Sequence, residues 1–119
     1  MRARLATILA TVWLAGCAGP SWQVLITSSS GVERMRGVLS VAERKDWSAI
    51  PLVIDRLSDD DPSVRLAASN VLRDMTGQQF GYEVYAPEEK RAEAVQRWKQ
   101  WWETEGKTKG KVEGLRSKV

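Results

Sequence analysis

Apolar residues recur with a helical period through the centre of the chain, and the clearest stretch covers residues 62–77. Its apolar positions fall at i, i+3, i+4, i+7, i+8 and i+11, which is one stripe of an α-helix: Val64, Ala67, Ala68, Val71, Leu72 and Met75. Asp61 is placed to be the N-cap, and Pro62 takes the first helical position, where its missing N–H costs nothing. Gly77 can end the helix by adopting a positive φ. The pattern therefore predicts a helix beginning at Pro62.

A second apolar stripe lies just before the first and predicts a partner helix. Its members share the same spacing: Ile50, Val53, Ile54 and Leu57. Ser48 is the expected N-cap, because a cap at Asp46 would put Pro51 at the fifth helical position, where its ring clashes with the preceding turn. The two stripes and the acidic turn between them predict a helical hairpin over residues 47–77. Leu52 and Leu66 lie off the stripes, so we expect them to face a second layer.

One further helix is expected on each side of the hairpin. The spacing of Ser30 and Glu33 is that of a capping box, and it begins a helix that reaches about residue 45. The apolar positions of that helix are Val32, Met35, Val38, Leu39 and Ala42. Pro87 begins a last helix, which Gly106 should end. Four helices in total predict an all-α fold.

The last helix carries a broad apolar face with three tryptophans: Ala94, Val95, Trp98, Trp101 and Trp102. At helical spacing such residues are usually core, although they could also form a platform on which a sugar or other ligand stacks. We favour the core and expect Trp98 and Trp102 to be its anchors, buried against the hairpin. Three aromatic residues of the preceding loop should pack around them with the tyrosine hydroxyls in water: Phe80, Tyr82 and Tyr85.

Charge is unevenly distributed along the 119 residues. Of the 18 Lys and Arg residues, Arg2 and Arg4 lie in the leader, so 16 face the 15 Asp and Glu residues that follow. Residues 107–119 carry five basic residues and one acidic residue, with few apolar ones. We expect this segment to be a basic, disordered tail.

The first residues have the layout of a secretory signal, with a basic start and a short apolar run. The sequence Leu14-Ala15-Gly16-Cys17 resembles the lipobox of bacterial lipoprotein signal peptides. The resemblance implies cleavage before Cys17 and attachment of acyl chains to that residue, which would anchor the chain to a membrane. We therefore expect a signal peptide over 1–16, a lipidated N-terminus and tether over 17–29, a helical domain over 30–106 and the tail over 107–119. The small apolar patch of residues 22–26 could instead dock on the domain. Ala18, by analogy with lipoprotein sorting, favours the outer over the inner membrane.

The hairpin sequence AIPLVIDRLSDDDPSVRLAASNVL resembles a HEAT repeat, an α-solenoid unit. The shared features are a proline in the first helix, the Asp61-Pro62 turn, and Arg65 in the second helix. The resemblance implies a mini-solenoid of helical hairpins, in which Asp60 or Asp61 and Arg65 join ladders between repeats. Residues 76–102 resemble the closing segment of bacterial HEAT-repeat proteins, so the tryptophan helix should cap the open end.

No reactive constellation is expected. The chain has no histidine and one cysteine, which removes Ser-His-Asp and Cys-His arrangements and the usual zinc ligands. Cys17 could be a nucleophile only if it stayed unmodified. The carboxylates of Asp59, Asp60 and Asp61 could bind Ca²⁺, but consecutive residues cannot all converge on one ion, and the spaced ligands of an EF-hand are missing. Turn and cap chemistry explains them better. We expect no catalytic residue, cofactor or metal.

These observations favour a non-catalytic, monomeric, lipid-anchored protein–protein interaction module of the bacterial envelope. Its partners would be the membrane, through the lipid on Cys17, and another envelope protein. A second hypothesis is a structural tether, whose basic tail grips an anionic polymer or lipid surface. A third is an accessory subunit of an envelope enzyme. Export argues against nucleic acid as a ligand of the basic tail.

Overall fold

The computed structural model describes residues 19–118, so the leader and Cys17 lie outside the described residues. Within this range all regular secondary structure is helical, and the all-α fold is confirmed. The α-helices are α1 (Trp22–Leu25), α2 (Gly31–Arg44), α3 (Ile50–Arg56), α4 (Pro62–Thr76), α5 (Glu88–Trp101) and α6 (Lys107–Arg116). Two short elements complete the order: a 3₁₀ turn, η1 (Trp47–Ala49), and a π-helical turn, η2 (Trp102–Gly106).

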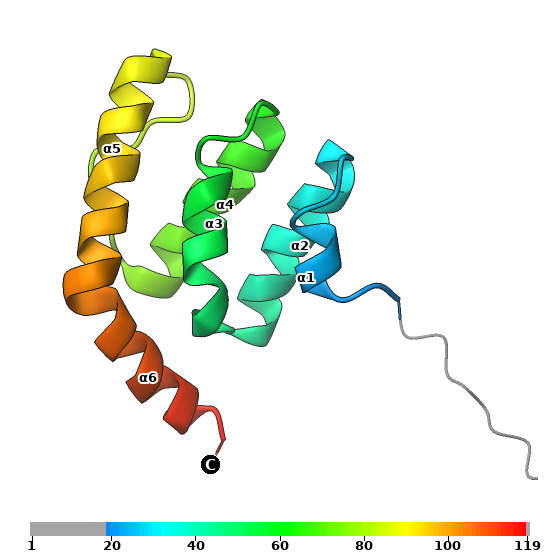
Figure 1. The fold of residues 1–119 in the computed structure, drawn as a ribbon, viewed down its shortest axis with the longest axis vertical. Helices are drawn as coiled ribbons and strands as arrows, with labels where there is room; N and C mark the ends of the chain where they lie inside the picture. The colour runs from blue at the N-terminus through cyan, green and yellow to red at the C-terminus, as the bar shows by residue number, and fades with distance from the viewer. Residues whose placement is uncertain (1–18, 119) are drawn as a thin grey trace, which may run out of the picture.

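The helices form successive hairpins that stand side by side (Figure 1). Helix α1 packs on α2 and α3 packs on α4, while α2 and α4 pack against each other and run in the same direction. Helix α5 packs on α3, and α6 continues from it to contact η1. The described chain begins, turns from α2 into α3, and ends along one common edge of the molecule (Figure 1). One hydrophobic core runs through all these hairpins.

Helix α4 begins and ends through local chemistry. The Asp61 carboxylate accepts a hydrogen bond from the Ser63 N–H at 2.8 Å, and Pro62 is the first helical residue. Gly77 ends the helix with φ of 73°, a conformation that costs glycine little. The buried side chains are those of the apolar stripe, from Val64 to Leu72.

Helix α3 begins differently from our expectation. Asp46, not Ser48, is the capping residue, and its carboxylate accepts a hydrogen bond from the Ser48 N–H at 3.1 Å. The η1 turn that follows delays the α-helix until Ile50, so Pro51 falls in the first helical turn. There its missing N–H has no partner to lose, and the clash that we foresaw does not arise. The Ser48 cap was therefore a wrong prediction.

The segment before α2 is docked on the domain where we expected a tether. Trp22 and Ile26 are buried, and Ile26 lies against Gly37 of α2. A Cβ on Gly37 would come within 2.5 Å of the Ile26 backbone nitrogen, so only glycine permits this approach. The described part of the segment is thus a short outer helix that covers α2.

The C-terminal segment is also ordered, which corrects the expectation of a disordered tail for Lys107–Arg116. Gly106 does not end α5, because η2 carries the chain on into α6. A Cβ on Gly106 would lie 2.5 Å from a Trp102 ring carbon and 2.9 Å from a Trp101 ring carbon. The backbone at Gly106, where η2 leads into α6, therefore lies directly against the two indoles. The sequence analysis counted apolar side chains, and such a count does not detect a backbone contact of this kind.

The aromatic cluster differs in detail from the expected one. Trp98 and Trp101 are buried, whereas Trp102 is half-buried beside α6. Phe80 meets Trp98 edge-on, with ring centroids 4.8 Å apart. The Tyr82 hydroxyl is not in water, because it donates a buried hydrogen bond of 2.6 Å to the Leu57 carbonyl. The ring of Tyr85, a residue expected to pack on the tryptophans, is exposed.

The expected second layer over the hairpin helices is incomplete. Leu52 and Leu66 have exposed fractions of 36% and 42%. Val32 and Leu39, expected to cover the hairpin from α2, are exposed as well. Helix α2 instead meets its neighbours through Val38 and Val41, which are fully buried.

Candidate functional site

A buried carboxylate, Asp59, joins the first hairpin to the second. Arg34 of α2 grips it with two hydrogen bonds, Nε to Oδ2 at 2.8 Å and Nη2 to Oδ1 at 2.9 Å. Arg56 adds a contact of 3.2 Å, and the Asp61 N–H donates to Oδ1 at 3.0 Å. Asp59 therefore fixes both the turn before α4 and the position of α2. Sequence reasoning missed this pair, because Arg34 lies 25 residues away.

The ionisation of Asp59 follows from these partners. Burial by itself raises the pKa of the carboxyl, but the Arg34 hydrogen bonds, the Asp61 N–H and the charges of Arg34 and Arg56 outweigh it. The pKa of Asp59 therefore lies below its ordinary value of 3.8. The carboxylate is a structural anion that is already neutralised, so it is not available to a ligand.

Arg34 and Arg65 occupy equivalent places in the two hairpins. Each is the fourth residue after its N-cap, and each donates Nη1 to a carbonyl six residues earlier, at 2.9 Å to Ser28 and 2.8 Å to Asp59. Arg65 therefore holds the backbone of its own turn and is not paired with the Asp60 or Asp61 carboxylate. The matching distance from the two N-caps, Ser30 and Asp61, is a sequence signal that could have revealed the pair of units.

The acidic turn is not arranged as a metal site. Asp59 faces the arginines, Asp61 caps α4, and Asp60 is exposed. Among residues 19–118, no three metal-ligating side chains gather around a common point. The three carboxylates thus diverge, as their consecutive positions suggest.

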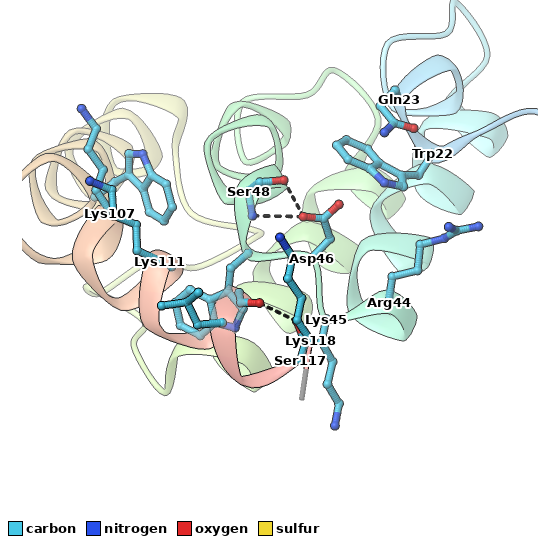
Figure 2. Close-up of a pocket in the computed structure, with 15 residues that line it drawn as sticks. Trp22, Gln23, Arg44, Lys45, Asp46, Ser48, Lys107, Lys111, Ser117 and Lys118 are labelled. Carbon is cyan, nitrogen blue, oxygen red and sulfur yellow. Dashed lines mark hydrogen bonds between the residues drawn. The ribbon is translucent and has the colours of Figure 1, made fainter.

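A groove of about 1040 Å³ lies at the edge where the described chain begins and ends. One wall is the end of α2 with η1, and the other is α6 (Figure 2). Its lining is rich in cationic and indole side chains: Arg44, Lys45, Lys107, Lys111, Lys118, Trp22, Trp47 and Trp102. The remaining lining includes Asp46, Ser48 and Leu115. Ligand pockets commonly measure 300–1,000 Å³, so the groove can hold more than a single small ion.

The floor of the groove depends on close approach of α6 to two indoles. A Cβ on Gly110 would lie 3.2 Å from a ring carbon of Trp102 and 3.7 Å from Cβ of Trp47. Gly114, one turn further on, has open space beside it and lines the groove. Gly110 and Gly114 of α6 thus share one face with Gly106, the last residue of η2, and lysines lie between them. That spacing of glycines is the sequence signal for the groove, whereas the composition of the segment predicts only a basic tail.

Positive charge in the groove is largely uncompensated. Lys107 pairs with Glu103 at 2.5 Å, and the Asp46 carboxylate is occupied by Ser48. Within the described range, no carboxylate lies within 4 Å of the side-chain nitrogens of Arg44, Lys45, Lys111 or Lys118. These cations come from both walls (Figure 2). The groove therefore attracts an anion, and its indoles offer surface to an apolar part of the same ligand.

The lining of the groove is made mainly of cationic and indole side chains. The chain has no histidine, and the groove's one carboxylate is held in a cap. Of the residues that sequence reasoning singled out, Trp102 lines this groove, while Trp98, Asp61, Pro62 and Arg65 do not. Cys17 lies outside the described residues.

No described helix combines the length and the apolar character needed to cross a membrane. Comparisons of the chain found no matching protein-family model, curated protein or solved structure.

Proposed function

We propose that this chain is a non-catalytic, lipid-anchored tether of the bacterial envelope, which grips an anionic surface through its groove. The observation that carries the proposal is the basic, tryptophan-lined groove between α6 and the end of α2. One attachment is the lipid on Cys17, and the groove supplies the second. Of our sequence-based hypotheses, the groove favours the tether, because the basic tail is folded into a wall of a binding site.

We also propose that the fold is a HEAT-like mini-solenoid. Its support is the equivalence of the α1–α2 and α3–α4 hairpins, whose turns are held by Arg34 and Arg65 in the same way. The bond from Arg34 to Asp59 links consecutive units, as an Asp–Arg ladder would. The ladder does not continue to a further unit: Arg65, the residue equivalent to Arg34, has a buried Nε that finds no partner among the described residues.

A second candidate function is the protein–protein interaction module. Leu39 and Leu66 support it, because they are exposed by 45% and 42% on two helices that pack side by side. Single exposed leucines are common on soluble proteins, so this observation is weaker than the groove. The envelope partner in this case would bind the α2–α4 face.

Photocrosslinking in living cells tests the proposal. A photoreactive residue would replace Gln23 or Ser117, both of which line the groove, or Gln96 and Gln100 as exposed controls on α5. We expect adducts with a phosphate- or carboxylate-bearing lipid or polymer from the groove positions and none from the controls. Equal labelling from both sets would overturn the tether. Protein adducts confined to residue 39 or 66 would favour the interaction module.

A further inference from the structure

The proposed lipid anchor places the groove at the membrane surface. Trp22 lines the groove and follows Cys17 by five residues. An extended chain spans about 3.3–3.6 Å per residue, so the two positions are separated by about 18 Å at most. The groove opens at the same edge as the start of the described chain. A lipid on Cys17 therefore keeps the mouth of the groove next to the phospholipid headgroups.

The exposed side chains around the groove suit an interface between water and lipid. On α6, Leu115 is exposed by 67% and lies between Lys111 and Lys118, and Val112 is exposed as well. Trp47 adds a half-buried indole from the opposite wall. Lysines mixed with tryptophan and exposed aliphatic residues are typical of segments that rest in the headgroup region. Such a surface buries its apolar groups when it contacts lipid, while its cations remain at the level of the phosphates.

We infer that the groove binds the phosphate headgroups of anionic phospholipids in the same membrane that holds the chain's own lipid. The inference rests on the proposed function and specifies its ligand. Arg44 lines the groove from α2 and Lys111 lines it from α6, so both walls carry positive charge toward the headgroups (Figure 2). The groove exceeds the volume that one phosphate needs, which suits headgroups with their glycerol and upper acyl carbons. Docked in this way, the protein lies with its groove edge on the bilayer.

Vesicle flotation tests the inference. The probe is the mature chain, residues 17–119, with Cys17→Ser so that no lipid contributes. It would be mixed with vesicles of phosphatidylcholine alone or of phosphatidylcholine with phosphatidylglycerol. The groove variant is Arg44→Gln with Lys111→Gln. The control is Arg36→Gln with Lys99→Gln, which removes the same charge at exposed positions that do not line the groove.

We expect the Cys17→Ser chain with an intact groove to float only with vesicles that contain phosphatidylglycerol, and salt should weaken the binding. A basic side chain near an anionic membrane contributes about 1 kcal/mol, or about fivefold in partitioning. The groove variant should therefore bind about 25-fold more weakly, and the control should bind within about twofold of the parent, because Arg36 and Lys99 lie outside the groove.

Equal binding by the groove variant and the control would overturn the inference, because charge alone would then explain it. Failure of the Cys17→Ser chain with an intact groove to float with phosphatidylglycerol would overturn it too. The proposed function would survive that failure if groove positions still crosslink to an acidic envelope polymer in cells. Binding that phosphatidylcholine alone supports would also count against a phosphate-directed site.

Discussion

Removing the charge of the buried Asp59 carboxylate should destabilise the fold strongly. In Asp59→Asn the side chain keeps its size, but Arg34 and Arg56 lose their shared carboxylate. Breaking a buried ion pair by changing one partner costs about 3–5 kcal/mol. The side chain of Arg34 is 15% exposed and that of Arg56 is 27% exposed, so water can compensate in part. We therefore expect a loss of about 2–3 kcal/mol in the free energy of unfolding.

Thermal unfolding followed by circular dichroism measures this loss. For a domain of this size, 1 kcal/mol shifts Tm by about 4–8 °C, so Asp59→Asn should lower Tm by about 8–24 °C. Asp60→Asn is the matched control, since Asp60 is exposed and its change should stay within about 0.5 kcal/mol. Arg34→Gln should cost less in the Asp59→Asn background than it costs alone, because the two side chains act on each other; the cost that remains is that of its bond to the Ser28 carbonyl. Full additivity, or an Asp59→Asn protein that melts like Asp60→Asn, would refute the reasoning.

The pH dependence gives an independent check on the same residue. The pKa of Asp59 is lowered in the folded state, so its contribution to stability is present above the ordinary value of 3.8. That contribution is lost as the pH falls through the lower, folded-state pKa. The difference in stability between the parent and Asp59→Asn should therefore shrink below about pH 4. A difference that stays constant from neutral to acid pH would mean that the charge of Asp59 does not stabilise the fold.

Three further changes test other parts of the structure. Trp98→Ala should cost about 3–5 kcal/mol, because it empties the buried centre of the aromatic cluster, and a melt like the parent's would place Trp98 at the surface. Gly106→Ala should lower the free energy of unfolding in urea by about 1–3 kcal/mol, because its Cβ would meet two indoles. Gly114→Ala is the control: its Cβ would enter open space, so it should be neutral or stabilising. Equal effects of the two changes would show that α6 does not pack as described. Cys17→Ser should abolish the lipid mass that we expect on the purified mature protein, and mass spectrometry showing an unmodified Cys17 in the parent would contradict the anchor.

The helices with strong local signals could be predicted from the sequence, and α4 is the clearest example. Its N-cap, its first-turn proline, its apolar stripe and its final glycine all lie within 17 residues. Helix α6 could not be predicted in the same way. The helix is ordered because its backbone packs against indole rings at Gly106 and Gly110, which have no side chain in the way. This contact depends on where the fold places Trp101 and Trp102. The start of α3 was missed because a 3₁₀ turn, which has little signal of its own, shifted the register of Pro51.

The candidate site depends on contacts between distant segments, and the sequence gives these only weakly. Each of the basic residues that line the groove is visible in the sequence. Arg44 and Lys111, however, are 67 residues apart, and they line one groove because α6 packs on η1. Likewise, the sequence presents Asp59 as one of three turn carboxylates, and its partner Arg34 is identified only by the fold, which brings the two side chains together. Composition predicts a basic tail, and in the structure this segment forms α6, one wall of the groove.

Cell fractionation tests the central claim most directly, because it separates the two attachments that the tether needs. Four forms would be compared in a bacterium that processes lipoproteins: the parent, Cys17→Ser, Arg44→Gln with Lys111→Gln, and all three changes together. We expect the parent to stay in the membrane fraction in high salt, and Cys17→Ser to be retained only in low salt, through the groove. The form with all three changes should be soluble in both. If Cys17→Ser and the triple form leave the membrane equally in low salt, the groove is not an attachment site and the account is contradicted.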